Sequence, residues 1–294
     1  MKEFLNKRKL IIFVILAIFV GFFVFEYFNH LPPRNLVQPG LEDSIIDTGS
    51  DNDSRPALND SDFESVPLAD TYLLNEGLGL VLEGIGGRGQ ARFYPFQILV
   101  WHNLVNDVWN GSSILVSYDP LCGSAAVFES ERLFKNSGKI YNNSMLFTAE
   151  ETDLLWRSFD GQTLPETGDN LSAIPSYVMT WQSFKENFPN GYVLSRETGS
   201  ARDYSHNPYG NYAATPAVWY PLNKYDSSYP AKTIVYSYGS EVFPLDNIKS
   251  AKTISGTEVD FVWDEELETV KGYDKNENEV ALTTAYWFCW AANH

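Results

Sequence analysis

The chain has 294 residues, of which 44% are hydrophobic, 15% aromatic and 20% charged, and its formal net charge is −17. This composition supplies enough apolar material for one large domain or two small ones and excludes a mainly disordered chain. Because nucleic-acid binding relies on Lys and Arg meeting phosphates, 21 basic residues against 38 acidic ones, with no basic stripe, predict that nucleic acid is not a partner.

The first 28 residues have the pattern of a membrane anchor. A basic cluster at 7–9 precedes an uncharged apolar run at 10–25, and aromatic residues extend the segment to 28. At a helical rise of about 1.5 Å per residue, such a run nearly crosses a hydrocarbon core of about 30 Å. We predict a cytoplasmic stub at 1–9 and a transmembrane helix at 10–28, since basic residues remain on the cytoplasmic side.

A cleaved signal peptide is the alternative for this segment. Signal peptides have a shorter apolar core and a small-x-small cleavage site, whereas "FEYFNHLPPR" follows the run here. The sequence therefore favours an uncleaved, single-pass anchor in the plasma membrane, with the rest of the chain extracytoplasmic. The stretch 31–70 is rich in Asp, Asn, Ser and Pro, so its composition is that of a solvated acidic spacer.

Beyond residue 72 most segments have the pattern of strands. They are rich in β-branched and aromatic residues and are separated by turn signals such as "WNGSS", "FPNG" and "ISGT". The predicted strands are "GLGLVLEGI", "QARFY", "SILVSY", "SAAVFES", "SYVMTW", "AKTIVYSY", "EVDFVW" and "TTAYWFCWA". Two segments, 95–107 and 180–188, have helical patterns, the first starting with Pro95 and the second with Thr180 as a possible cap. We predict a β-rich α+β fold, a mostly antiparallel sheet of barrel or sandwich type with a few short helices.

Several motifs occur together in a fixed order. They are "ARFYPFQILVWHNLVND", "VSYDPLCGSAAVF", "NSGKIYNNSMLF", "TDLLWRSFDGQTL", "MTWQSFKENFPNGYVLSRETGSARDY", "NPYGNY" and "AYWFCWAANH". In this order they resemble a bacterial and archaeal family catalogued as domain of unknown function 3179, over roughly 90–294. "DSRPALNDSDFESV" resembles the opening segment of that family, so the expected domain is 45–294 and the acidic linker shrinks to 29–44.

The resemblance implies no settled activity, but it shows where this chain departs from the family. The family usually has Tyr-Cys-Pro-Leu-Cys-Gly, and Asp119 stands here at the first of those cysteines. Asn103 replaces a Glu in the family's helix. A late Trp-Phe-Ala-Trp becomes "WFCW", which adds Cys289 to Cys122 as the second cysteine of the chain.

Cys122 has three interpretations. It can bind a metal ion together with Asp119 and His102, and with His206 as a further option, because thiolate, imidazole and carboxylate suit copper or zinc. It can be a small buried hydrophobic residue. It can form a disulfide with Cys289, provided that the two Cα atoms lie within about 7 Å. A local dithiol switch is excluded, because Asp119 has no sulfur.

The leading functional hypothesis is a metal-binding or thiol-based module centred on Cys122, with copper or zinc as the cofactor. The alternative is a cell-surface binding or scaffold domain for a polymer or protein partner, in which Cys122 is purely structural. A hydrolase is the weakest hypothesis, because no nucleophile–base motif supports it. A metal site requires the Cys122 sulfur to lie within bonding reach of an imidazole nitrogen or a carboxylate.

Overall fold

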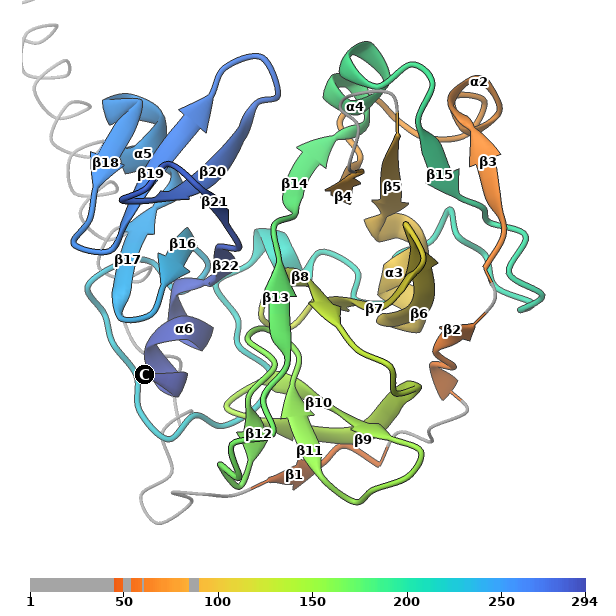
Figure 1. Ribbon diagram of the computed structural model, residues 1–294. Coiled ribbons are helices and arrows are strands. Elements are labelled where there is room, and N and C mark those ends of the chain that lie inside the picture. The colour runs from red at the N-terminus through yellow and green to blue at the C-terminus, as the bar shows by residue number, and fades with distance from the viewer. Residues whose placement is uncertain (1–44, 50–53, 60, 85–89) are drawn as a thin grey trace, which may run out of the picture.

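The computed structural model describes residues 45–49, 54–59, 61–84 and 90–294. These residues form many short strands and a few short helices (Figure 1). The helices are α2 (Val66–Ala69), α3 (Phe96–His102), α4 (Trp181–Asn187), α5 (Leu245–Ala251), α6 (Trp287–Asn293) and the 3-10 helix η2 (Tyr212–Ala214). The β-rich character with few helices, predicted from the sequence, is confirmed.

The described strands are divided among five sheets, which we number I to V. Sheet I has the order β1 (Ile46–Asp47), β9 (Phe134–Tyr141), β10 (Ser144–Ala149), β11 (Leu155–Arg157), β12 (Thr163–Leu164). Sheet II has the order β13 (Ser172–Ile174), β8 (Ser124–Glu129), β7 (Ser112–Asp119), β6 (Leu104–Trp109), β2 (Leu58–Asn59). Sheet III has the order β14 (Tyr177–Thr180), β4 (Leu78–Glu83), β5 (Ala91–Pro95), β15 (Tyr192–Leu194), β3 (Phe63–Ser65). Sheet IV has the order β17 (Glu241–Pro244), β16 (Ile234–Tyr238), β22 (Thr283–Tyr286), and sheet V the order β18 (Thr253–Ser255), β19 (Val259–Asp264), β20 (Thr269–Asp274), β21 (Glu279–Val280).

Pairing is mostly antiparallel, as predicted; β2 with β6 and β5 with β15 are parallel. The division into five separate sheets makes the fold β-propeller-like, where the sequence predicted one barrel or sandwich. Strands of one sheet come from distant parts of the chain: sheet III combines β3, β4 and β5 with β14 and β15. Such pairings depend on long-range packing, which the local pattern of each strand does not encode.

Sheet II is the central layer of the larger part of the molecule. Along β7, Ile114 and Val116 join a core shared with sheet III, whereas Leu115 joins a core shared with sheet I. The neighbouring β8 alternates in the same way, with Val127 on the first side and Phe128 on the second. Because both faces of the sheet are buried, these strands have nearly continuous apolar sequences instead of alternating ones.

The outer face of sheet III is covered by α4. The Phe93 ring of β5 lies 5.4 Å from the Trp181 ring and 4.9 Å from the Phe184 ring, measured between centroids. Thr180 caps this helix, since its side chain accepts a hydrogen bond from the Ser183 amide, as the sequence predicted. The β19–β20 hairpin of sheet V is attached here too, through a bond from Ser183 Oγ to the Leu267 carbonyl.

Two predicted elements are corrected. The helix expected at 95–107 ends at His102, because Asn103 has a φ of 65°, and the chain then enters β6 in the central sheet. Asparagine tolerates this left-handed conformation better than most residues. The strand expected in "TTAYWFCWA" ends at Tyr286, and the following residues form α6. Aromatic residues favour strands intrinsically, but tertiary packing decides the outcome here.

The predicted stub at 1–9, transmembrane helix at 10–28 and linker at 29–44 lie outside the described residues. Across the ranges that the structure does describe, we find no helix with the length and apolar character needed to span a bilayer.

Candidate functional site

Cys122 lies in the turn between β7 and β8 and forms a disulfide with Cys289 of α6. The two Cα atoms are 5.5 Å apart, and both residues are fully buried. Val218, Leu222 and Phe288 pack around the bridge. A buried disulfide offers no thiolate, so in this state the sulfur of Cys122 neither ligates a metal nor reacts with solvent molecules. Its role here is to tie the C-terminal helix to the central sheet.

Asp119, at the end of β7, organises the same turn. One carboxylate oxygen, Oδ1, accepts hydrogen bonds from the amides of Leu121 (2.9 Å) and Cys122 (3.2 Å). The other, Oδ2, accepts from the Met145 amide and from Ser158 Oγ, both at 2.7 Å. Burial raises the pKa of Asp119, and these four donors oppose that effect. Because both carboxylate oxygens accept hydrogen bonds from groups of the protein itself, the role of Asp119 is to stabilise this turn.

His102, in the last turn of α3, is fully buried between two polar partners. Its Nδ1 lies 2.9 Å from the Pro56 carbonyl, which accepts only if Nδ1 carries the proton. Its Nε2, 2.6 Å from Tyr204 Oη, then accepts from that hydroxyl. Burial lowers the pKa of His102, and the nearby Arg202 guanidinium adds to this effect. The imidazole is therefore held neutral as a link between α3 and the loop that contains Tyr204.

Acidification should destabilise the protein through His102. The pKa of His102 is lower in the folded state than in the unfolded state, so folding favours the neutral imidazole. The contribution of His102 to the free energy of unfolding is therefore present above the unfolded-state pKa of about 6.5 and is lost as the pH falls towards the folded-state pKa. We expect the urea-unfolding free energy of the wild type to decrease from pH 7 to pH 5, and that of His102→Gln to decrease less. The exposed His206→Gln serves as the control and should keep the wild-type dependence. Identical slopes for His102→Gln and wild type would contradict the assignment.

The candidate metal ligands are thus not assembled into a site. Among the described residues, no group of three or more His, Cys, Asp or Glu side chains is placed to hold a metal ion. Cys122 is in a disulfide, Asp119 binds the turn, and His102 bridges Pro56 and Tyr204. His206 is exposed on the loop after β15, where its ring centroid lies 6.5 Å from that of Trp101.

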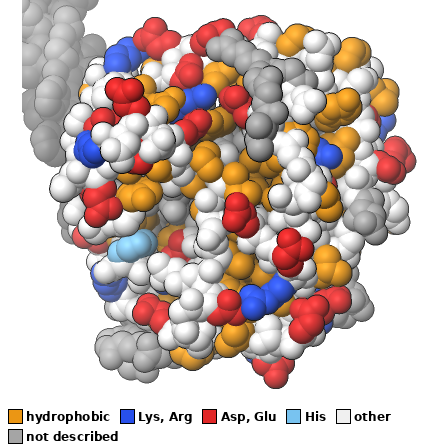
Figure 2. Space-filling model, viewed as in Figure 1, with side chains coloured by type: hydrophobic (Ala, Val, Ile, Leu, Met, Phe, Trp, Pro, Cys, Tyr) orange, Lys and Arg blue, Asp and Glu red, His pale blue; other side chains and the backbone are white. Residues whose placement is uncertain are grey.

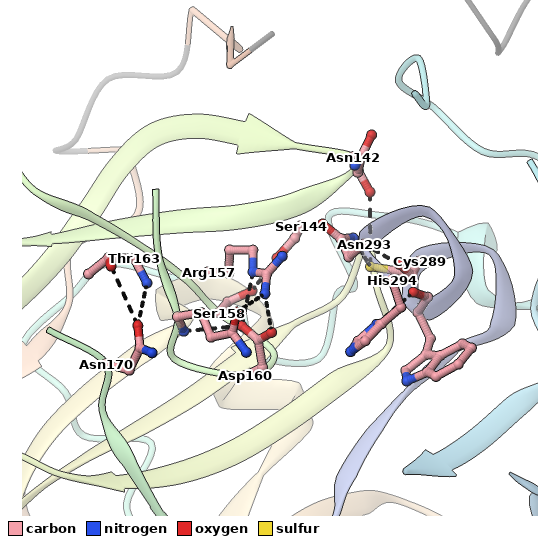
Figure 3. A network of polar contacts seen from close by, with 12 residues as sticks. Asn142, Ser144, Arg157, Ser158, Asp160, Thr163, Asn170, Cys289, Asn293 and His294 are labelled. Atoms are coloured by element: carbon pink, nitrogen blue, oxygen red, sulfur yellow. Dashed lines mark hydrogen bonds and ion pairs between the residues drawn. The ribbon is translucent and has the colours of Figure 1, made fainter. Parts of the chain in front are cut away.

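A buried polar network lies around Cys289, the disulfide-bonded residue of α6 (Figure 3). Asn142, in the β9–β10 turn, donates to the Ala292 carbonyl of α6 at 2.8 Å. Nearby, Arg157 forms an ion pair with Asp160 at 2.5 Å, and both side chains are almost fully buried. The pKa of Asp160 is nevertheless raised, because desolvation outweighs the attraction of Arg157. The Asn142 bond joins sheet I to α6, and the Arg157–Asp160 pair fixes the turn after β11, so both contacts are structural.

The concave site that the sequence did not predict is a cleft of about 720 Å³ beside α3. Its floor is aromatic: the Phe96 ring stacks on the Tyr118 ring with centroids 4.1 Å apart and planes 18° apart. Leu74, which precedes β4, and Leu78, its first residue, also line the cleft. They are 65% and 44% exposed and extend its apolar surface. A volume of this size, with an apolar floor, is typical of ligand-binding clefts. We refer to it as the α3 cleft.

The opposite wall of the α3 cleft is the loop at 195–207, which is polar. Arg196 stacks its guanidinium over the Tyr72 ring, 4.4 Å from the centroid, and remains 49% exposed. Arg202 donates to the Ser54 carbonyl at 2.6 Å. Asp203 accepts from the amide and hydroxyl of Ser205, which lowers the pKa of Asp203. The loop is therefore fixed by its own contacts. Arg196 is half exposed at the cleft and forms a loose ion pair with Glu197, whose carboxylate lies 3.9 Å away.

The face of the molecule drawn in Figure 2 carries acidic side chains with apolar areas between them. In Figure 2, hydrophobic side chains gather over the middle of the visible face, and acidic side chains are scattered around and among them. On a protein with a net charge of −17, the charges that line the cleft are balanced, because Arg196 and Arg202 stand beside Glu197 and Asp203. The signal in the sequence was "RETGSARDYSHNPYGNY", of which Arg196, Arg202 and Tyr204 line the cleft.

Comparison with known proteins places the chain in a family without a described activity. Neither the curated proteins nor the solved structures contain a match to this chain. One family model, described as "Protein of unknown function (DUF3179)", matches residues 52–284. The match includes the α3 cleft and Cys122, and it ends before Cys289. Since the matched range is most of the sequence, the chain belongs to the DUF3179 family.

Proposed function

We propose that this chain is a membrane-anchored, extracytoplasmic binding module that holds a ligand in the α3 cleft, with the Cys122–Cys289 disulfide as a structural support. The observation that carries the proposal is the cleft itself, with Phe96 stacked on Tyr118 as its floor and Arg196 exposed on its rim. The buried disulfide supports an extracytoplasmic location, because disulfides persist mainly in oxidising compartments.

The contacts in the cleft favour binding over hydrolysis. Asp203, Ser205 and His206 are neighbours in sequence, but Ser205 Oγ donates to Asp203 at 2.6 Å instead of to an imidazole. A serine nucleophile needs a base that takes its proton, and a carboxylate that already accepts from the Ser205 amide is a poor one. Ser205 and Asp203 therefore shape the loop.

The walls of the cleft indicate the chemistry of the ligand. Aromatic rings stack on sugar faces or apolar side chains, and a guanidinium binds a carboxylate through paired charge-assisted hydrogen bonds. A segment of an extracellular polymer that combines such a face with a carboxylate satisfies both walls. A muramyl dipeptide has this combination and is small enough to serve as a soluble probe.

Binding of a muramyl dipeptide to purified full-length protein should be measurable by calorimetry. Arg196→Ala should weaken it by about 10- to 100-fold, because a hydrogen bond to a charged group contributes about 1.5–3 kcal/mol. Phe96→Leu, which removes the stacked ring and keeps an apolar side chain, should weaken it by about 3- to 10-fold.

The matched controls are Arg132→Ala and Tyr192→Ala. Arg132 is 42% exposed and Tyr192 is 51% exposed, and neither lines the cleft. Both controls should bind as the wild type does. Equal affinity of Arg196→Ala and wild type, or the absence of binding by the wild type, would refute this ligand class.

A further inference from the structure

Another cavity, of about 60 Å³, lies beside β9 and β10 of sheet I. Leu121, Ile140 and Leu146 form the apolar part of its lining, and all three are at most 3% exposed. Arg55 and Lys139 add two basic side chains, and none of the residues that line the cavity is acidic. By volume there is room for about two water molecules, so an occupant is a small polar group and not a chain segment. We refer to this cavity as the Arg55 pocket.

No described carboxylate neutralises the two cations of the Arg55 pocket. Both side chains are partly buried, and across the described ranges of the chain neither forms an ion pair with Asp or Glu. Asp47, opposite Lys139 on β1, uses its carboxylate to accept a hydrogen bond from a nearby backbone amide. The Arg55 guanidinium lies over the Tyr209 ring, 4.8 Å from its centroid, and Asn136 holds the Arg55 carbonyl through a 2.7 Å hydrogen bond. On a protein with a net charge of −17, two such cations in one pocket attract an anion locally.

A buried hydroxyl adds a third donor to the Arg55 pocket. Tyr209 lines the pocket and is 6% exposed, and its hydroxyl has no hydrogen-bond partner among the described residues. Burial raises the pKa of Tyr209, and although the Arg55 charge opposes this effect, the phenol stays neutral and keeps its proton to donate. The nearby Asp119 does not line the pocket, and its oxygens already accept four hydrogen bonds. Buried hydroxyls nearly always have a partner, so one without a protein acceptor in the wall of a pocket indicates a ligand that accepts from it.

We propose that the Arg55 pocket binds a small oxyanion, the carboxylate or phosphate group of a ligand, with Arg55, Lys139 and the Tyr209 hydroxyl as donors. A guanidinium matches two oxygens of such a group, an ammonium adds a point charge, and a phenol donates one further hydrogen bond. Trp219 lines the same pocket, stacks on Tyr209 with centroids 5.6 Å apart and is 49% exposed, so its ring is available to the part of the ligand that carries the anion. None of the three donors lines the α3 cleft, so this site does not depend on the proposed function.

The test is calorimetric titration of the purified full-length protein with sodium acetate and, in a separate arm, with sodium phosphate, while chloride keeps the ionic strength constant. We expect saturable binding of one anion per chain, and the anion that binds more tightly identifies the ligand group as a carboxylate or a phosphate. Arg55→Gln and Lys139→Gln should each weaken this binding by about tenfold or more, because each removes a charge-assisted hydrogen bond. Tyr209→Phe, which removes only the hydroxyl, should weaken it by about five- to tenfold.

Stability measurements and matched controls separate an anion site from a structural role. In chloride buffer, Tyr209→Phe should keep the urea-unfolding free energy of the wild type, because the hydroxyl has no described protein partner to lose. The controls are Lys135→Gln, which changes an exposed lysine of the same strand β9, and Arg196→Ala in the α3 cleft, and both should bind the anion as the wild type does. Absence of binding by the wild type, equal affinity of wild type and Arg55→Gln, or loss of binding in Arg196→Ala would overturn the proposal.

Discussion

Replacing Cys289 with alanine should lower the free energy of unfolding by about 4 to 5 kcal/mol. The bridge joins residues separated by 167 positions, and in the chain-entropy model closing a loop of that length restricts the unfolded state by about 5 kcal/mol at 25 °C. It also holds α6, whose Phe288 and Ala292 pack against Cys122. Urea unfolding of the wild type and the variant, followed by tryptophan fluorescence, measures the difference.

The disulfide prediction has an internal control. Cys122→Ala should lose a similar amount, and the double variant Cys122→Ala/Cys289→Ala should lose no more than either single variant, because one bond is removed in all three. Wild type unfolded in the presence of dithiothreitol should approach the double variant. If the single variants lose less than about 1 kcal/mol of unfolding free energy, the disulfide contributes little to the stability of the fold.

Replacing Asp119 with alanine is expected to cost about 3 to 5 kcal/mol. The substitution removes the acceptor of four hydrogen bonds, from the amides of Leu121, Cys122 and Met145 and from the Ser158 hydroxyl. A buried donor left without a partner costs about 1–3 kcal/mol, and partial rearrangement or entry of water offsets some of the sum. Unfolding in urea and the thermal midpoint measure the effect.

A graded series tests the explanation for Asp119. Ser158→Ala removes one of the four donors and should cost about 1 kcal/mol. Asp119→Asn keeps the size of the side chain but turns one acceptor oxygen into a donor that faces other donors, so it should cost at least about 2 kcal/mol. A neutral effect of Asp119→Asn would mean that volume, and not hydrogen bonding, is what the turn requires.

The folding of single segments could be predicted from the sequence, since the signals are local. The apolar strands of sheet II and the capped helix α4 follow from side-chain pattern and a threonine cap. Membership of the DUF3179 family also follows, because its motifs occur in order along the chain. The disulfide was one of three alternatives for Cys122, and sequence had no means to choose among them.

Other features required the folded structure. The helix predicted at 95–107 shortened because Asn103 turns the chain into the central sheet, and "WFCW" became helical because α6 packs on Cys122. The partners of Asp119 and His102 come from positions far along the chain, such as Met145 and Tyr204, so local pattern could not supply them.

The sequence by itself determined the β-rich class, the family and the acidic character of the protein, because composition, periodicity and turn residues act within a few positions of one another. The tertiary structure decided the site. It joined Cys122 to Cys289, turned the candidate ligands Asp119 and His102 into structural hydrogen-bonding groups, and placed the loop at 195–207 opposite α3 to form the cleft. These outcomes depend on which surfaces bury one another, and burial is settled only when distant segments pack together.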